Sequence, residues 1–382
     1  MTKSILKRIF RVLAFALVGL LIAHMVLSEK KIYWQDMSFA SMSTFVKFRF
    51  YVRDTNALAP AANLVQSAFR EVNMRCNRFD PESELAKLNS TAYKEPFRCS
   101  DELWVLLNDA RRMYLLSNGA FDVTIEPLMK LWGFHRKEKK LPTAEAIAEA
   151  KKKVGMDKII FDDQAKTVRF TVEGMSIDLG GIAKGAALDL AAEKLRDKTA
   201  VGTELSGDVS WMKYLEARFN NRLSPLNRGF VDVGGNVIAL DEAPPKQEAY
   251  IAAVRNPVAP RSLNHCATAK ILGESISTSG NYERYVTIDG KQYAHIVDPA
   301  TGMPVSGVLS VTVITKRAVD ADALSTAFFV RGHDTAFYQA MKKEFPDLRL
   351  LMYYRDPASP EKISFWSEGD WLEITVPAEE TK

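Results

Sequence analysis

The sequence is poor in cysteine, which excludes a fold that depends on several disulfide bonds or on a cysteine-bound metal. Its three cysteines, Cys76, Cys99 and Cys266, have neither C-x-x-C spacing nor another metal-binding pattern. An odd number cannot form a complete set of disulfides, and a chain of 382 residues can bury a core that is stable without them. Cys76 and Cys99 could pair in an oxidising compartment, but we expect buried free thiols.

The sequence also lacks the charge pattern of a nucleic-acid-binding protein. It has 51 lysines and arginines against 47 acidic residues, so its net charge is only +4. No basic stripe with interleaved aromatic residues is present, and we therefore expect no nucleic-acid partner. The hydrophobic fraction of 47% is ordinary for a globular protein.

One long apolar run is present, at the N-terminus. Four basic residues precede the apolar residues 12–27, and no acidic residue appears before Glu29. Basic residues on the near flank keep that end in the cytoplasm and direct the downstream chain across the membrane. We expect residues 1–30 to anchor the chain in the bacterial inner membrane, with a cleaved signal peptide as the second possibility and a buried helix as the third. Either of the first two would place the rest of the chain in the periplasm.

The remaining residues, 31–382, alternate between strand patterns and amphipathic helices, which indicates a mixed α+β domain with two lobes. Residues 29–41 are expected to be a juxtamembrane connection, and the polar stretch at about 203–228 a surface insertion. Helices are expected at 60–77, 84–88, 101–117, 143–154, 182–196, 321–330 and 335–345. Strands are expected at 44–53, 158–161, 167–171, 175–178, 230–240, 250–255, 275–279, 285–288 and 310–315, with β-like segments at 348–354 and 364–376.

A first candidate site lies at residues 177–185, Ile-Asp-Leu-Gly-Gly-Ile-Ala-Lys-Gly, where a glycine turn opens a helix. Free N–H groups and the helix dipole at such a turn favour an anion, and Lys184 could neutralise a phosphate. The spacing is neither G-x-G-x-x-G nor Walker A, which argues against a dinucleotide-binding fold and a P-loop. Taken alone, such a motif is more often a tight structural turn.

A second candidate site lies at residues 318–326, Ala-Val-Asp-Ala-Asp-Ala-Leu-Ser-Thr. Asp322 and Thr326 are four residues apart, so a helix would place both on one face. A carboxylate together with a hydroxyl oxygen suits Mg²⁺ and not Zn²⁺. Asp320 either supports these ligands or caps the helix.

Two polar segments, at 277–284 and 293–302, bring small hydroxyls and an arginine close in sequence to His295. His295 is the histidine best placed for proton transfer, although a lone histidine is more often structural.

Residues 119–134 carry aromatic side chains around an acidic residue. Phe121 and Trp132 could enclose an aromatic ring, while Asp122 could accept from ring N–H groups. Each aromatic residue, taken singly, is more often part of the core.

Taken together, these segments closely resemble the FAD:protein FMN transferases, the ApbE-like family. The resemblance covers roughly residues 42–332 and keeps the family's order of motifs. The motifs are RFDPESELAKLN at 78–89, GAFD at 119–122, the glycine turn after Asp178, VGGN at 233–236, SGNYER at 279–284 with His295, and DALST at 322–326. Any one of them is weak, but six in order are specific.

The resemblance implies a two-lobed α+β fold of the ApbE-like, T-fold-like type that binds FAD, its substrate, between the lobes. It implies that FAD is contacted by Met42, Phe79, Ala120, Phe121, Asp122, Asp178, Lys184 and Ile296. It also implies that Mg²⁺ is bound by the backbone carbonyl of Gly181 and by Asp322 and Thr326, with Ser325 beside them. His295 matches a histidine with a suspected catalytic role. Asn281 stands where the family often has Asp, which removes one charge near the site.

The function implied is Mg²⁺-dependent transfer of FMN from FAD to a threonine or serine hydroxyl of an acceptor protein, with release of AMP. His295 or a nearby carboxylate would take the hydroxyl proton. Acceptors of the family are membrane electron-transport subunits, which agrees with a membrane-tethered enzyme. Two alternatives stay open: a FAD-binding flavin carrier, and a FAD pyrophosphatase that yields FMN and AMP.

Overall fold

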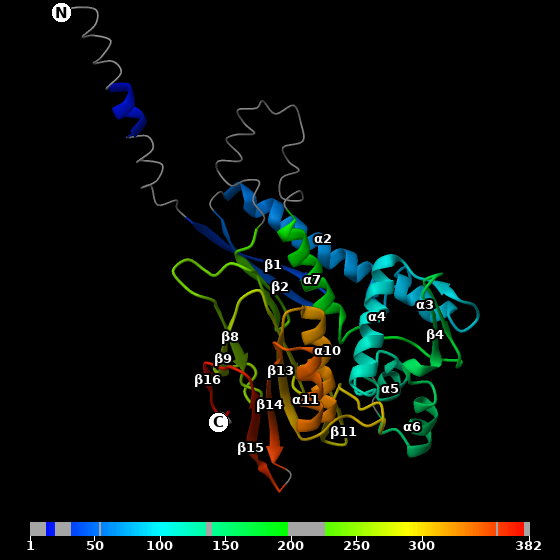
Figure 1. Cartoon of the computed structure of the whole chain (residues 1–382). Helices are drawn as coiled ribbons and strands as arrows, with labels where there is room; N and C mark the ends of the chain where they lie inside the picture. The colour runs from blue at the N-terminus through cyan, green and yellow to red at the C-terminus, as the bar shows by residue number, and fades with distance from the viewer. Residues whose placement is uncertain are drawn as a thin grey trace, which may run out of the picture.

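The computed structural model describes residues 13–19, 32–52, 55–134, 140–197, 226–356 and 358–377. In this part of the chain an eight-stranded sheet, in the order β1-β2-β6-β7-β10-β13-β14-β15, forms the middle of the larger lobe (Figure 1). Its strands are β1 (Tyr33–Ser41), β2 (Thr44–Val52), β6 (Gly229–Val233), β7 (Asn236–Ala239), β10 (Ser275–Gly280), β13 (Val308–Thr315), β14 (Arg349–Asp356) and β15 (Ser359–Glu368). All neighbouring strands in it run antiparallel.

Three smaller sheets and a set of helices complete the described part. The sheets are β16-β9-β8, β3-β5-β4 and β11-β12. Their strands are β3 (Phe97–Arg98), β4 (Ile159–Asp162), β5 (Thr167–Phe170), β8 (Tyr250–Arg255), β9 (His265–Ile271), β11 (Tyr285–Ile288), β12 (Lys291–Ala294) and β16 (Glu373–Ile374). The α-helices are α2 (Leu58–Cys76), α3 (Glu84–Thr91), α4 (Asp101–Leu116), α5 (Glu126–Leu131), α6 (Ala144–Lys151), α7 (Ala183–Arg196), α10 (Ala318–Arg331) and α11 (Thr335–Glu344).

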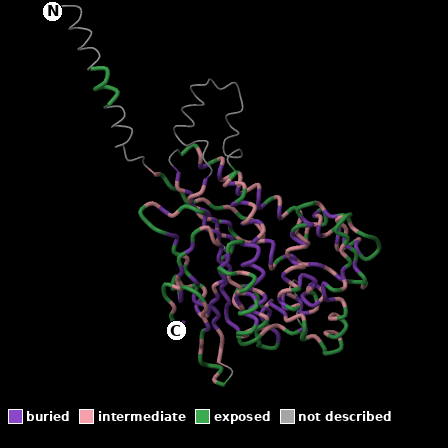
Figure 2. The backbone as a smooth tube through the Cα atoms, viewed as in Figure 1, coloured by how far each residue is buried: buried purple, intermediate pink, exposed green. Residues whose placement is uncertain are grey.

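The large sheet is covered on both faces. On one face, α2, α7 and α10 lie side by side, and α10 contacts β10 and β13. On the other face lies the small sheet β16-β9-β8, whose residues cluster with Ile314 of β13. Strand β13 is therefore buried at every position. The buried backbone in Figure 2 concentrates where these layers meet.

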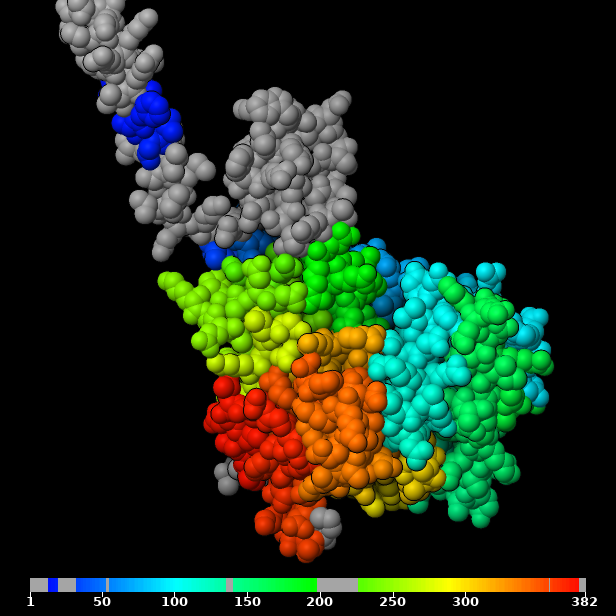
Figure 3. Space-filling model, viewed as in Figure 1, coloured from blue at the N-terminus to red at the C-terminus, as the bar shows by residue number. Residues whose placement is uncertain are grey.

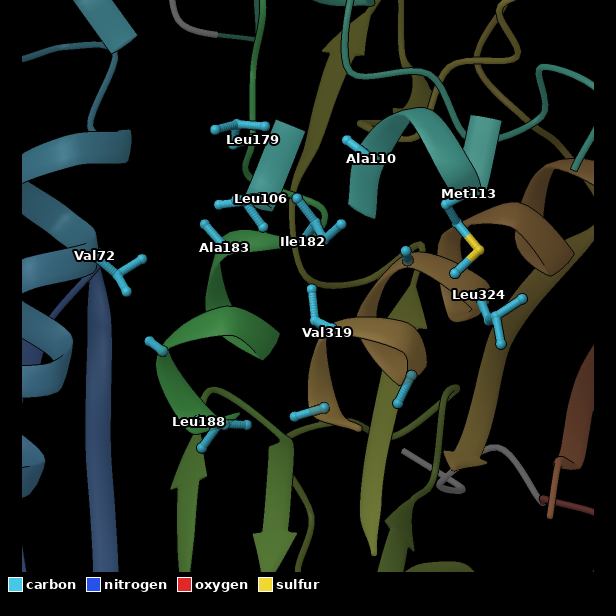
Figure 4. Packing of buried hydrophobic residues seen from close by; sticks show 14 of the residues in the cluster. Val72, Leu106, Ala110, Met113, Leu179, Ile182, Ala183, Leu188, Val319 and Leu324 are labelled. Carbon is cyan, nitrogen blue, oxygen red and sulfur yellow. The ribbon is translucent and has the colours of Figure 1, made fainter. Parts of the chain in front are cut away.

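Apolar side chains join the helix layer to the second lobe, as Figure 4 shows. Val319 and Leu324 of α10 pack near Ala110 and Met113 of α4, all in one continuous core. The second lobe contains α3 to α6 and the sheet β3-β5-β4, and its surface adjoins that of α10 and α11 (Figure 3). This contact places the start of α10 at the boundary between the lobes.

Local capping signals explain why several helices begin where the sequence predicts. The hydroxyls of Ser83, Ser100 and Thr143 accept from the N–H groups three residues later, at the starts of α3, α4 and α6. Strand β2 alternates as predicted, with Val46 and Phe48 facing the core. The mixed α+β expectation is confirmed.

Four sequence expectations about the fold are wrong. The connection expected at 29–41 contains the edge strand β1, in which only Met37, Phe39 and Ser41 are partly buried and the other side chains are exposed. Residues 175–178 are irregular and form no strand. The strand expected at 230–240 is a hairpin, because Gly234 and Gly235 turn the chain between β6 and β7. Helix α5 and strands β3, β9 and β12 are absent from the prediction.

The three cysteines are free thiols, as expected. Cys99 and Cys266 are buried and Cys76 is partly buried. Burial raises the pKa of Cys76 and of Cys99 to about 12, so neither thiol is reactive near neutral pH.

Two expectations fall largely outside the described residues. Of the expected anchor at 1–30, only residues 13–19 are described, and they are helical. Within the described ranges no helix combines the length and apolarity needed to span a membrane. Of the expected insertion at 203–228, only residues 226–228 are described.

Candidate functional site

The site is built where the first turns of α7 and α10 meet. A Cβ added to Gly185 would lie 2.3 Å from the carbonyl oxygen of Ala318, so only glycine permits this approach. The N–H of Gly185 donates to Asp322 Oδ2 at 3.0 Å. In return, Asp189 of α7 accepts from the N–H groups of Ala318 and Val319 at 2.8 and 2.9 Å. Each helix thus gives the other a carboxylate that accepts its free N–H groups.

Asp189 supplies the cap that the start of α10 lacks in its own sequence. Arg317, the residue before α10, makes no side-chain capping bond. Asp320, expected as a possible cap, is instead paired with Arg112 of α4 and with Arg317. Burial raises the pKa of Asp189 to about 6, while its bonds to the two N–H groups oppose that rise.

Asp322 lies at the centre of the site and is only 3% exposed. Its Oδ1 accepts from the Asn236 side-chain amide at 2.8 Å and lies 3.4 Å from Lys184 Nζ. Asn236 in turn accepts from Ser277 Oγ at 2.8 Å. A buried charge is costly unless it is paired and hydrogen-bonded, and all of these partners reduce that cost.

A row of hydroxyl groups extends from Asp322 toward strand β10. Ser325 Oγ lies 2.8 Å from Ser279 Oγ and 3.4 Å from Ser277 Oγ. Thr326 Oγ1 lies 3.3 Å from Ser279 Oγ. The structure therefore brings together the three predicted residues of α10 and adds two serines from the neighbouring strand.

The glycine turn faces the same hydroxyls. A Cβ on Gly181 would lie 3.6 Å from Thr326 Oγ1 and 3.3 Å from the ring of Phe121. One carboxylate, hydroxyl oxygens and a backbone carbonyl are the hard donors that Mg²⁺ takes. Within the described ranges no group of three His, Cys, Asp or Glu side chains could hold a metal. Zn²⁺ usually takes Cys, His and carboxylate ligands, whereas this donor set has one carboxylate and otherwise neutral oxygens.

Arg78 organises the opposite side of the glycine turn. It donates to Glu126 Oε1 at 2.6 Å, pairs with Asp178 Oδ2 at 3.0 Å and lies over the ring of Phe79 at 4.1 Å. Asp178 also accepts from the N–H of Gly180 at 2.8 Å, which closes the turn. Glu126 is fully buried, and burial raises its pKa. Arg78 therefore fixes two residues that were expected to contact FAD.

The predicted residues 120–122 lie just inside the turn. Ala120 and Phe121 are buried, and Phe121 accounts for the close approach to Gly181. Asp122 is turned inward, because its Oδ1 accepts from both the N–H and the hydroxyl of Thr124, at 2.8 and 2.6 Å. Burial raises the pKa of Asp122 to about 6. Only the second carboxylate oxygen of Asp122 remains for a ligand.

Trp132, considered as a wall for an aromatic ring, belongs to a separate part of the core. It is fully buried and its Nε1 donates to the Gly302 carbonyl at 2.9 Å. It clusters with Leu128 and Val297, so it holds α5 against the segment after His295. Of the two interpretations of Trp132, the structure supports the core position, given above as the more frequent one, and not the ring wall.

Met42 occupies the tight turn between β1 and β2. Its φ is +50° and that of Ser43 is +61°, values that a two-residue hairpin turn needs and that glycine or asparagine usually supplies. A methionine held in this conformation carries a backbone cost of about 1 kcal/mol or more, and such strain clusters at functional sites. This agrees with the expected position beside the flavin.

His295 comes directly after the hairpin β11-β12 and is held by one carbonyl group. Its backbone N–H and its Nδ1 lie 3.1 and 3.0 Å from the Arg284 oxygen. A carbonyl only accepts, so Nδ1 carries the proton and Nε2 keeps a lone pair. Burial lowers the pKa of His295 to about 4, and the charges of Arg284 and Lys184 act in the same direction. The imidazole is neutral near pH 7, and its neighbour Ile296 is buried.

Glu283 offers a second proton acceptor, which the sequence interpretation did not name. Glu283 is exposed as a residue, but neighbouring atoms displace water from its carboxylate, and this loss of hydration raises its pKa. The charge of Lys184 opposes that rise, and the charge of Asp322 adds to it.

Several other site residues were not named from the sequence, because no local sequence pattern indicates their contacts. Asn236 and Arg78 lie inside recognisable motifs, but their bonds join segments that are far apart in sequence. Asp189 and Glu126 lie in ordinary amphipathic helices, where nothing in the sequence marks them.

Comparisons with known proteins agree with this arrangement. A family model described as ApbE family matches residues 42–213 and 222–349. A curated FAD:protein FMN transferase of Haemophilus influenzae is 30% identical over 287 residues, which cover 73% of this chain and 74% of that protein. One of Vibrio cholerae is 28% identical over 292 residues, which cover 75% of this chain and 78% of that protein.

Solved structures share the fold. The ApbE protein of Thermotoga maritima is 28% identical and has a TM-score of 0.70, covering 87% of this chain and 96% of its own. The flavin transferase ApbE of Vibrio cholerae, 23% identical, has a TM-score of 0.69 and covers 88% and 97%.

Proposed function

The chain belongs to the ApbE family, and we propose that it transfers FMN from FAD to a threonine or serine hydroxyl of an acceptor protein, with Mg²⁺ bound and AMP released. Membership makes the chain an enzyme of the flavin transferase class; the metal, the acceptor residue and the leaving group are the proposed part. One observation carries the proposal. The buried Asp322 lies beside a lysine, a helix start and a row of hydroxyls.

The donor set described above would hold the ion through Asp322, Thr326 and the Gly181 carbonyl, with Ser325 beside them. Bound there, Mg²⁺ would neutralise charge on the FAD pyrophosphate and on the departing AMP. Lys184 adds a fixed positive charge on the same side, and the first turn of α7 offers N–H groups to phosphate oxygens.

The chain's other residues would position the flavin and move one proton. Phe79, Phe121 and Met42 are proposed to contact the ring, together with Ala120, Asp122 and Ile296. The acceptor hydroxyl oxygen attacks the phosphorus of the FMN half, the bond from that phosphorus to the AMP phosphate breaks, and AMP leaves. The hydroxyl proton passes to Nε2 of His295, which is neutral and oriented by the Arg284 carbonyl. Glu283 is the alternative acceptor.

The proposed acceptor is a subunit of a membrane electron-transport complex, and residues 1–30 would hold the enzyme at the inner membrane with its site in the periplasm. This part of the proposal is supported by the basic and apolar pattern of the N-terminal sequence. Tethering would raise the concentration of enzyme near such a partner.

The test uses the full chain with FAD, Mg²⁺ and a candidate flavin-domain acceptor. The intact mass of the acceptor should increase by FMN minus water, and the gain should disappear with EDTA and with Asp322→Ala. Release of FMN and AMP without a mass gain on several acceptors would favour the FAD pyrophosphatase. Tight FAD binding without either product would favour the flavin carrier.

A further inference from the structure

A hollow lies beside the segment that holds His295, and no residue proposed to bind FAD or Mg²⁺ lines it. Its volume is about 460 Å³. The lining residues are Ala259, Pro260, Arg261, Ser262, Tyr282 and Tyr285. They come from the loop between β8 and β9 and from the start of the hairpin β11-β12.

The two tyrosines connect the hollow to the proton acceptor. Tyr282 and Tyr285 flank Arg284, whose carbonyl holds both His295 Nδ1 and the His295 backbone N–H. The hollow therefore adjoins, through Arg284, the residue that is proposed to accept the hydroxyl proton.

The surface around the hollow has the composition of a protein interface. Tyr285 is 47% exposed, and Leu263, in the same loop as Arg261, is completely exposed. Arg261 is exposed and forms no ion pair with the described residues. Tyrosine and arginine are enriched at protein interfaces and among the residues that contribute most to binding.

Positive side chains outnumber negative ones in the segments that line the hollow. Residues 255–263 and 282–285 contain three exposed arginines, Arg255, Arg261 and Arg284, against one exposed carboxylate, Glu283. Loss of hydration raises the pKa of Glu283, and the charges of Arg255 and Arg284 oppose that rise. Such a field attracts an acidic partner and repels a basic one. The half-exposed rim also differs from a small-molecule site, which encloses most of its ligand.

We propose that this hollow, the acceptor-docking surface, binds an exposed loop of the acceptor protein that carries an acidic side chain next to the modified hydroxyl. The acidic group pairs with Arg261, and the loop packs against Tyr282 and Tyr285. This inference rests on the proposed function, and it adds which face the acceptor uses and what chemistry it presents. Docking there would bring the hydroxyl to His295 ahead of water.

The binding test uses the full chain with FAD and Mg²⁺ and two synthetic peptides. The peptides are identical except that aspartates flank the single threonine in one and lysines flank it in the other. By calorimetry at low salt, the wild-type chain should bind the acidic peptide at least about tenfold more tightly, because charge complementarity governs partner choice. Arg261→Glu should reverse the preference, and Tyr285→Ala should weaken binding of the acidic peptide about tenfold.

Arg169→Glu is the matched control, since Arg169 is an exposed arginine on β5 in the other lobe. It should leave both peptide affinities unchanged. No measurable binding of the acidic peptide, equal binding of the two peptides, or an unchanged preference in Arg261→Glu would each overturn the docking surface. So would an Arg261→Glu variant whose KM for FAD, measured by AMP release, rises as much as its peptide Kd, because the hollow would then bind FAD.

Transfer is measured separately, by the mass of each acceptor. A chain that binds the acidic peptide with the expected preference, yet adds FMN to no acceptor, would refute the proposed function and leave the docking surface standing. If the wild-type chain adds FMN to an acceptor and Arg261→Glu changes nothing, the proposed function would stand and the docking surface would be refuted.

Discussion

The α7–α10 contact and the acceptor-docking surface differ in how their polar groups are satisfied. At the contact, Asp322 and Asp189 bond to backbone and side-chain groups of the chain itself. At the docking surface, Arg261 has no ion pair with the described residues and Leu263 is completely exposed. The residues proposed to bind FAD and the metal are thus held in place by the fold, whereas Arg261 of the proposed docking surface has no such partner among the described residues.

The substitution Asp322→Ala tests the α7–α10 contact most strongly. We expect transfer to fall about 10³-fold, because metal-assisted charge stabilisation is worth several kcal/mol. The N–H of Gly185 and the amide of Asn236 would lose their acceptor, at about 1–3 kcal/mol of unfolding free energy each. AMP release and urea denaturation measure the two effects. Asp322→Asn keeps one of the two acceptor oxygens and should recover part of the stability without recovering the rate; recovery of the rate would contradict the proposed ligand role.

Gly185→Ala tests the close approach of the two helices. The added Cβ meets the Ala318 carbonyl, so we expect a loss of about 3 kcal/mol of unfolding free energy from overpacking, despite the better helix propensity of alanine. Urea denaturation measures it. Glu193→Ala, at an exposed position of the same helix, should change the unfolding free energy by less than about 0.5 kcal/mol. Equal effects of the two substitutions would mean that the crossing is not tightly packed.

His295→Ala should lower transfer about 10²-fold, the usual contribution of a general base. In the free enzyme the pKa of His295 is about 4, and the neutral form is the one that accepts a proton. The rate constant kcat/KM should therefore stay level from pH 8 to about pH 5 and decline as the pH falls toward 4. His333→Ala, whose ring stacks on Trp366, should keep the wild-type profile. A decline of kcat/KM that begins near pH 6.5 would show that the pKa of His295 is not lowered as described.

Asp189→Asn should have a smaller and more selective effect. An amide oxygen can replace only part of the two bonds to the start of α10, so we expect about a tenfold higher Mg²⁺ requirement with nearly unchanged rate at saturating Mg²⁺. Calorimetric titration with Mg²⁺ in the presence of FAD checks the affinity directly. Asp334→Asn alters a similar cap, at α11, and should leave the Mg²⁺ requirement as it is. If both substitutions changed the Mg²⁺ requirement equally, Asp189 would act only as a helix cap.

Arg261→Ala should be the mildest change for the fold. Because Arg261 is exposed and unpaired within the described residues, the unfolding free energy should move by less than about 0.5 kcal/mol. Thermal and urea denaturation check this. A larger loss of unfolding free energy would show that the loop before β9 contributes to the stability of the fold. The docking surface would then not differ from the α7–α10 contact in the way described.

The fold is predictable from the sequence where local chemistry decides the structure. Ser83, Ser100 and Thr143 mark helix starts because the capping bond spans only three residues. Strand β1 escapes prediction because its first four residues are exposed, so the alternation that turns Met37 and Phe39 toward the core covers only its second half. Residues 175–178 look like a strand by composition, but no neighbouring strand pairs with them in the described part of the chain.

The site residues also divide into those that a local sequence pattern marks and those that only tertiary contacts reveal. The spacing of Asp322 and Thr326 on one helix, and the glycine turn with Lys184, are local patterns and could be recognised. The bonds that position them are not local: Asp189 reaches α10 across 129 residues of sequence, and Arg78 reaches Glu126 across 48. Phe121 and Trp132 lie in the same motif, and only the tertiary contacts separate them: Phe121 lies against Gly181 of the glycine turn, whereas Trp132 belongs to a separate core cluster.

The exchange of carboxylates between α7 and α10 also constrains how this site can change over generations. Loss of Asp189 would loosen the helix that presents Asp322, and loss of Asp322 would free the N–H at Gly185 that steadies the helix carrying Asp189. The effects of the two substitutions cannot add independently, since each alters the structure in which the other acts. Neither aspartate has a neutral first step toward replacement, so descendants of this chain should keep both or, having lost one, soon lose the other.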